Sequence, residues 1–150
     1  MEKLVDDFRK VASITGITLH ENAISVEILD APHTPPTSLP TNKMAIYIFK
    51  NESGEYLKVG KVGPRSSARY TSQHYNPKSA KSTLAASLLT HKKELNLSHL
   101  DCNNVGEWVK NNTTRTNLLL DADLGPCVLT LLESFLHCRL NPKFEGHQWR

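Results

Sequence analysis

Residues 44–49 read MAIYIF and residues 56–62 read YLKVGKV, and these two runs decide the fold. Both are rich in β-branched and aromatic residues, which favour buried strands. Between them, residues 51–54 read NESG, a composition typical of a tight turn. The stretch therefore predicts an antiparallel β-hairpin within a small sheet.

The chain beyond the hairpin predicts helices and one further strand. Residues 117–120 read NLLL, which suits a third core strand. Pro126 lies near the start of the next segment and Pro142 just past its end, so residues 127–140 form the clearest helix in the sequence. Shorter helices are expected at residues 66–74, 82–95 and 104–111. We therefore expect an α+β fold with a small antiparallel sheet of about three strands, flanked by helices.

The N-terminal part of the chain reads as an extension of this core. Apolar spacing predicts an amphipathic helix over residues 2–13, and alternation predicts short strands at residues 17–19 and 24–28. Four prolines make residues 30–41 a rigid connector that suits neither a helix nor a central strand. The expectation is a single domain, divided into an extension at residues 1–41 and a core at residues 42–150.

The composition is that of a soluble globular protein, with 39% hydrophobic and 22% charged residues. No apolar run reaches the roughly 18 residues that a membrane-spanning helix needs, so no membrane association is expected. The three cysteines are an odd number and form neither a CxxC pair nor a zinc-ligand pattern. Reduced thiols, together with a start that lacks a secretion signal, indicate a cytoplasmic protein.

Positive charge is concentrated in one window. Residues 58–93 contain eight lysines and arginines and no aspartate or glutamate, although the net charge of the whole chain is only +3. A run of charge is most often a solvated face. A surface that binds phosphates needs the same lack of carboxylates, so a polyanionic partner is the alternative interpretation.

A carboxylate lies in the most apolar helix of the sequence. Glu133 interrupts the run VLTLLESFLH at residues 128–137. If this side chain is buried, it must be paired, protonated or bound to a metal. Alternatively, it marks a solvent-facing stripe together with Thr130, His137 and Arg139. The helix pattern alone leaves both interpretations open.

Tyr47, Lys58, Arg69 and Glu133 together suit the hydrolysis of a phosphodiester. A carboxylate can hold a divalent metal against a phosphate oxygen, and an arginine can neutralise the charge that builds in the transition state. A lysine with a lowered pKa can act as a general base toward water, and a tyrosine can orient that water. Gly60 suggests that another group approaches the strand closely there.

The sequence resembles the GIY-YIG nucleases, a family named after two strand motifs followed by a helix arginine and a later glutamate. Residues 45–47 match the first motif with alanine in place of glycine, and residues 58–60 match the second with Lys58 in place of tyrosine. Arg69 and Glu133 stand where the family has its arginine and its metal-binding glutamate. The resemblance covers residues 44 to about 146.

The departures from the family pattern define a subtype. A lysine in the second motif is also found in some restriction endonucleases of the family, where it is taken as the general base. Glu145 stands where the family usually has asparagine. The family often has a further histidine or tyrosine after the arginine, for which His74 and Tyr75 are both candidates.

The resemblance implies a DNA endonuclease that depends on Mg²⁺ or Mn²⁺, with no organic cofactor, acting in restriction, phage defence or DNA processing. It implies catalytic roles for Tyr47, Lys58, Arg69, His74 and Glu133, with Glu133 as metal ligand. Substrate contacts are expected from Lys61, Arg65, Tyr75, Lys78 and Lys81. The family core does not explain the N-terminal extension or the insert at about residues 78–105, and we expect these segments to supply substrate recognition or a homodimer contact. The main alternative is a binding module that holds nucleic acid without cutting it; an RNA-directed nuclease is disfavoured because no aromatic stacking platform is evident.

Overall fold

Four antiparallel strands form the centre of the molecule in the computed structural model, which describes residues 1–144. The strands are β1 (Ile24–Leu29), β2 (Lys43–Asn51), β3 (Tyr56–Val62) and β4 (Thr113–Asp121), and their order in the sheet is β1-β4-β2-β3. The predicted hairpin is confirmed as β2 and β3. The predicted third strand is β4, which begins four residues earlier than expected. The α+β class is thereby confirmed, with one strand more than the core pattern predicts.

The additional strand comes from the N-terminal segment. β1 pairs with β4 along its whole length, from Ile24 opposite Leu120 to Leu29 opposite Arg115. The segment before the proline-rich connector is therefore part of the same sheet. The short strand predicted at residues 17–19 is wrong, because these residues form no regular element.

Within residues 1–144, five α-helices and two short 3₁₀ turns surround the sheet. The predicted helices are found, although residues 82–95 form a shorter helix than expected and residues 66–74 divide into a short α-helix and a 3₁₀ turn. Pro126 lies in the first turn of the last helix, and Asn141 ends it with a left-handed backbone conformation. The elements are α1 (Glu2–Ile14), α2 (Ser67–Thr71), η1 (Gln73–Tyr75), α3 (Leu84–Thr90), α4 (Val105–Asn112), η2 (Ala122–Leu124) and α5 (Gly125–Leu140).

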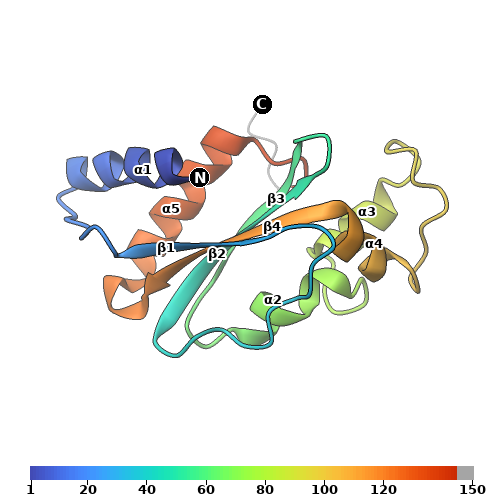
Figure 1. Ribbon diagram of the computed structural model, residues 1–150, viewed down its shortest axis with the longest axis horizontal. Helices are drawn as coiled ribbons and strands as arrows, with labels where there is room; N and C mark the ends of the chain where they lie inside the picture. Colours follow the sequence, from blue (N-terminus) through green and yellow to red (C-terminus); the bar gives the residue numbers. More distant parts are fainter. Residues whose placement is uncertain (145–150) are drawn as a thin grey trace.

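The helices divide between the two faces of the sheet (Figure 1). On one face, α1 and α5 pack against a core that contains Phe8, Ile46 and Leu132. On the other face, α2, α3 and α4 surround a second core that contains Phe49, Tyr70 and Leu88. Because side chains alternate along a strand, neighbouring residues of β2 and β3 contribute to different cores. We call the two sides the α5 face and the α2 face.

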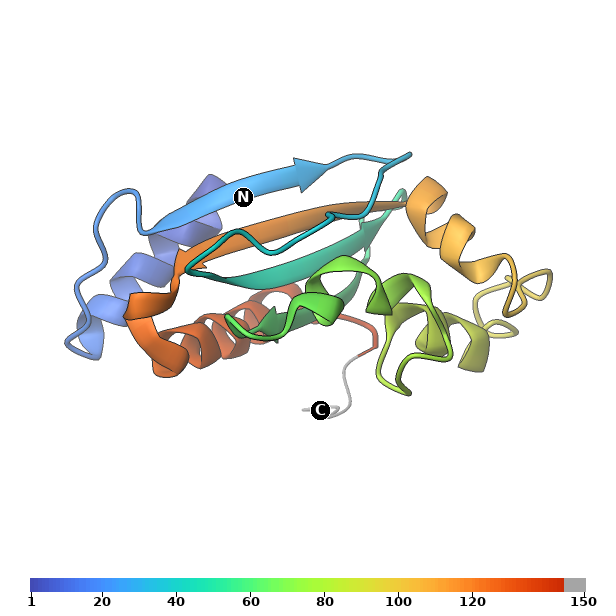
Figure 2. The same cartoon turned by 90° about the horizontal axis from the view of Figure 1, so that it is seen from below.

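The two outer strands differ in how their edges are covered. At β3, the backbone N–H groups of Lys143 and Phe144 donate to the carbonyl oxygens of Tyr56 and Leu57. At β1, five of the six residues are at least partly open to solvent, and the strand forms the outer margin of the sheet (Figure 2). None of the helices in the described residues has the length and apolar character needed to cross a bilayer. Cys102, Cys127 and Cys138 are exposed free thiols.

Candidate functional site

A row of residues crosses all four strands on the α2 face. The strand registers place Glu27 opposite Asn117, Asn117 opposite Tyr47, and Tyr47 opposite Gly60. The Tyr47 ring lies over Gly60 so closely that a Cβ atom at position 60 would collide with its hydroxyl oxygen. This observation confirms the expectation that a side chain approaches the strand at Gly60.

His74 packs against Tyr47 beneath this row. The two ring centroids are 4.2 Å apart, and His74 is buried. Burial, followed by the positive charges of Lys58, Arg115 and Arg69, lowers the pKa of His74 from 6.5 to about 3. The Leu84 N–H donates to Nδ1 over 3.2 Å, so the neutral ring carries its proton on Nε2. Across residues 1–144, this buried Nε2 has no hydrogen-bond partner.

Lys58 lies on the same face, one row further along. It stands opposite Phe49, is buried, and donates from Nζ to the Phe144 carbonyl oxygen over 3.0 Å. Arg69 is carried by α2 and is exposed. Because the charges of both residues act on His74, the α2 face brings together four of the predicted site residues: Tyr47, Lys58, Arg69 and His74.

A buried arginine that the sequence analysis missed supports this group. Arg115 on β4 is completely buried between the rings of Phe49 and Tyr70. Its guanidinium donates to the Asn117 Oδ1 over 2.9 Å, to the Tyr75 hydroxyl over 3.2 Å and to the Tyr70 carbonyl oxygen over 2.5 Å. Arg115 therefore ties the sheet to α2 and η1, the segments that carry Arg69 and His74.

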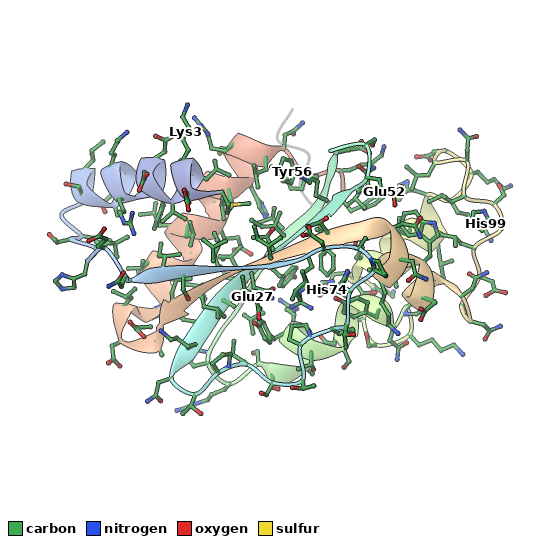
Figure 3. All side chains as sticks on the ribbon, viewed as in Figure 1. Lys3, Glu27, Glu52, Tyr56, His74 and His99 are labelled. Atoms are coloured by element: carbon green, nitrogen blue, oxygen red, sulfur yellow. The ribbon has the colours of Figure 1, made fainter. Side chains whose placement is uncertain are left out.

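The network continues to both sides of Arg115. Glu27 accepts hydrogen bonds from the Asn117 amide over 2.6 Å and from the Tyr70 hydroxyl over 3.1 Å. Burial and the Glu27 carboxylate raise the pKa of Tyr70 to about 12. The Tyr75 hydroxyl also bonds His33 Nε2 at 2.8 Å. Figure 3 shows Glu27 and His74 on this side of the sheet.

Glu133 belongs to the opposite, α5 face. Its Oε2 forms an ion pair with Lys61 Nζ at 2.8 Å, and Lys61 also donates to the Thr130 hydroxyl over 3.0 Å. The Glu133 side chain is 20% exposed and paired with Lys61, so it is neither deeply buried nor fully open to solvent. The interpretation as a solvent stripe is closer, because Thr130 and Arg139 are exposed and His137 is half-buried.

The predicted set therefore forms two groups. Lys58 and Lys61 are three residues apart on β3, so they point to opposite faces. Lys58 belongs to the group around His74, and Lys61 to the pair with Glu133. Both groups include a residue of β3, an outer strand of the sheet.

Glu133 offers a single carboxylate to a divalent ion, and Lys61 already pairs with that carboxylate. Within residues 1–144, no group of three or more histidine, cysteine, aspartate or glutamate side chains is arranged to hold a metal. A protein site for Mg²⁺ often supplies only one or two carboxylates, while water and substrate phosphates complete the shell. In a metal-dependent nuclease, the partly exposed carboxylate of Glu133 would have that role. An ion pair at such a site is worth about 1 kcal/mol or less, so a cation can displace Lys61 at small cost.

The expected substrate contacts divide by exposure. Arg65, Lys78 and Lys81 are exposed, as a phosphate-binding role requires. Lys61 is held by Glu133, and Tyr75 is engaged by Arg115 and His33. The hydroxyl group of Tyr75 is therefore part of the internal network, although the side chain is only partly buried. Glu145 lies outside the described residues.

Comparisons with models of known protein families, with curated proteins and with solved structures find no match to this chain.

Proposed function

We propose that the protein is a DNA endonuclease of the GIY-YIG type that depends on a divalent metal ion. The observation that carries this proposal is the group on the α2 face, where Tyr47 packs on Gly60 and on His74 beside Lys58. The tyrosine of the first motif and the glycine of the second are cross-strand partners. Each of the two strand motifs, residues 45–47 and 58–60, is weak evidence by itself, but their tyrosine and glycine are in direct contact.

The order of elements supports the same proposal. The hairpin β2–β3 leads directly into α2 with Arg69, and β4 returns beside β2 before α5 carries Glu133. The site then lies at the outer edge of β3, which both groups border. A phosphodiester at this edge has Lys58 on one side and Lys61 with Glu133 on the other.

Each residue has a distinct role in the proposed hydrolysis. Lys58 first loses its own proton to solvent and then, as general base, takes a proton from water, whose oxygen attacks the phosphorus. The phosphorus–oxygen bond to the leaving group breaks, and the departing oxygen receives a proton from solvent. Arg69 compensates the negative charge that builds on the phosphate. Tyr47 orients the attacking water.

His74 is better suited to donating a hydrogen bond than to accepting a proton. Its lowered pKa makes it a weak base at neutral pH, whereas its Nε2–H is buried and available to a bound oxygen. Glu133 would hold Mg²⁺ or Mn²⁺, which supplies neutralisation of phosphate charge. Lys61, when displaced from Glu133, can turn to the phosphate.

One observation favours the alternative, a module of the same fold that binds nucleic acid without cutting it. The Glu133 carboxylate already has a cationic partner in Lys61, so it needs no metal to be stable. In that case Lys61 and Glu133 are only a structural ion pair. The exposed cations Arg65, Arg69, Lys78 and Lys81 would still hold a polyanion.

A cleavage panel distinguishes the two functions. Supercoiled plasmid, single-stranded DNA and RNA are incubated with the protein, with Mg²⁺, with Mn²⁺ or with a chelator. The proposal predicts nicking of the plasmid only when a metal is present. It also predicts that Lys58→Met abolishes nicking, while Lys3→Met, an exposed lysine on α1, cuts as the parent does.

DNA binding without cleavage under every condition would support the binding module and overturn the nuclease. Cleavage of RNA in preference to DNA would overturn the substrate class. Retention of DNA binding by Lys58→Met, measured on the same preparation, separates a chemical role from a loss of folding.

A further inference from the structure

The outer margin of β1 is an unprotected strand edge. Val26 is 38% exposed and Ile28 is 54% exposed, and the strand register places both on the α5 face. β1 contains no lysine, arginine or proline, the residues with which proteins commonly block strand addition. The opposite edge of the sheet, at β3, is partly covered by residues 143–144.

The charged residue of β1 does not block this edge. Glu27 lies on the α2 face, where Asn117 and the Tyr70 hydroxyl hold its carboxylate over the sheet. The unpaired backbone groups of the outer side therefore remain accessible alongside two apolar side chains. Such an edge is a template for another strand.

We propose that β1 pairs antiparallel with β1 of a second copy of this chain, joining two sheets across a twofold axis. The sequence ISVEIL is complementary to itself when Val26 faces Val26 of the second copy. Ile24 then faces the second copy's Ile28, so the α5 face gains a continuous apolar ladder. On the α2 face, Ser25 faces the second copy's Glu27.

The neighbouring register is unfavourable. In an antiparallel pair, two facing residues have their side chains on the same side of the sheet. When a twofold axis relates the two strands, one residue at the centre of the pair therefore faces its own copy. Centring on Glu27 places two like charges directly opposite each other, which is destabilising. Centring on Ser25 or Ile28 pairs only three residues of each strand, whereas centring on Val26 pairs five, so the self-pairing favours Val26 as its centre. This pairing is independent of the proposed nuclease activity.

Sedimentation velocity over a range of protein concentrations measures the association. We expect the mass to rise from the 16.8 kDa of the monomer toward twice that value, with a dissociation constant in the micromolar range because the strand is short. Val26→Lys and Ile28→Lys each keep the protein monomeric. Ile14→Lys, at the 86% exposed apolar residue of α1, is the matched control and leaves the association unchanged.

Cysteine cross-linking tests the register. In a background where Cys102, Cys127 and Cys138 are replaced by serine, Val26→Cys should form a dimer under mild oxidation, because facing residues lie within disulfide reach. Ile28→Cys should not form a disulfide-linked dimer, because the two cysteines would lie four residues apart along the paired strands. A mass that stays monomeric up to millimolar concentration would overturn the pairing. Equal cross-linking at both positions, or at Ile28→Cys alone, would overturn the register.

Discussion

The aromatic ring of Tyr47 lies directly over Gly60, its cross-strand partner on β3. The hairpin therefore has a tyrosine whose position depends on the absence of a side chain across the strand. The same ring contacts His74, which belongs to the segment after α2. Gly60 thus sets the depth at which Tyr47 and His74 sit beneath the sheet.

Gly60→Ala is expected to destabilise the protein by about 1–3 kcal/mol, because the new methyl group collides with the Tyr47 hydroxyl and ring. Chemical denaturation measures the change in the free energy of unfolding. Gly63→Ala is the matched control, since a Cβ atom there meets nothing within 4 Å, and its effect should stay within about 0.5 kcal/mol. In a Tyr47→Val background the cost of Gly60→Ala should largely vanish. Equal costs in both backgrounds would contradict the packing described.

Arg115→Lys should destabilise the protein by about 2–4 kcal/mol, because a lysine cannot reproduce the three hydrogen bonds that Arg115 donates from its buried position. Thermal unfolding is the measurement, and a domain of this size should lose several degrees in Tm for each kcal/mol. Arg65 is exposed, so Arg65→Lys serves as the control and should have the same Tm as the parent protein. If Arg115→Lys unfolded at the same temperature as Arg65→Lys, the network would contribute nothing to the stability of the protein.

Stability should fall on acidification because of His74. The unfolded chain binds a proton at His74 near pH 6.5, whereas the folded chain resists it down to about pH 3. Between these values the unfolded state binds more protons, so the free energy of unfolding rises with pH across this window. The full effect of His74 is about 5 kcal/mol, lost progressively from pH 6.5 toward pH 3.

The variant His74→Asn isolates this contribution, because asparagine offers an acceptor to Leu84 N–H but does not titrate. Urea unfolding of both proteins at several pH values should show a smaller loss in the variant. Burial also lowers the pKa of His33, but that contribution is common to both proteins and cancels in the difference. If the free energy of unfolding changed with pH in the same way in the parent and in His74→Asn, the pKa of His74 would not be lowered in the folded protein.

The exposed cations of the basic window should contribute to DNA affinity without sequence preference. Lys78→Ala with Lys81→Ala is expected to weaken binding uniformly and to reduce the slope of log K against log salt by about 2, if each lysine contacts one phosphate. Fluorescence anisotropy with a labelled duplex at several salt concentrations measures the slope. Lys3→Ala with Lys10→Ala on α1 removes the same charge and should leave the slope unchanged.

Local patterns were sufficient to predict the hairpin and the helices. Their signals are short-range: strand composition around NESG, and prolines that frame α5. The place of β1 was not predictable in this way, because its partner β4 lies about ninety residues further along the chain. The alternation of apolar and polar residues predicted that β1 is a strand, but it did not indicate which strand β1 pairs with.

The site was predicted less completely than the fold. Alternation along β3 already separates Lys58 from Lys61, and this signal could have placed them on different faces. Arg115 had no comparable signal, since an arginine in a polar stretch such as TTRTN suggests a solvent-facing position. Its burial depends on Tyr70, Tyr75 and Asn117, which only the tertiary structure brings together.

The rate at which Glu133→Gln nicks supercoiled plasmid with Mg²⁺, under single-turnover conditions, tests the nuclease most directly. Glu107→Gln on α4 is the control, because it neutralises an exposed carboxylate away from the proposed site. We predict that Glu133→Gln loses about 100-fold or more in rate while retaining DNA binding, and that Glu107→Gln cuts like the parent. A Glu133→Gln protein that nicks plasmid at the rate of the parent would contradict it.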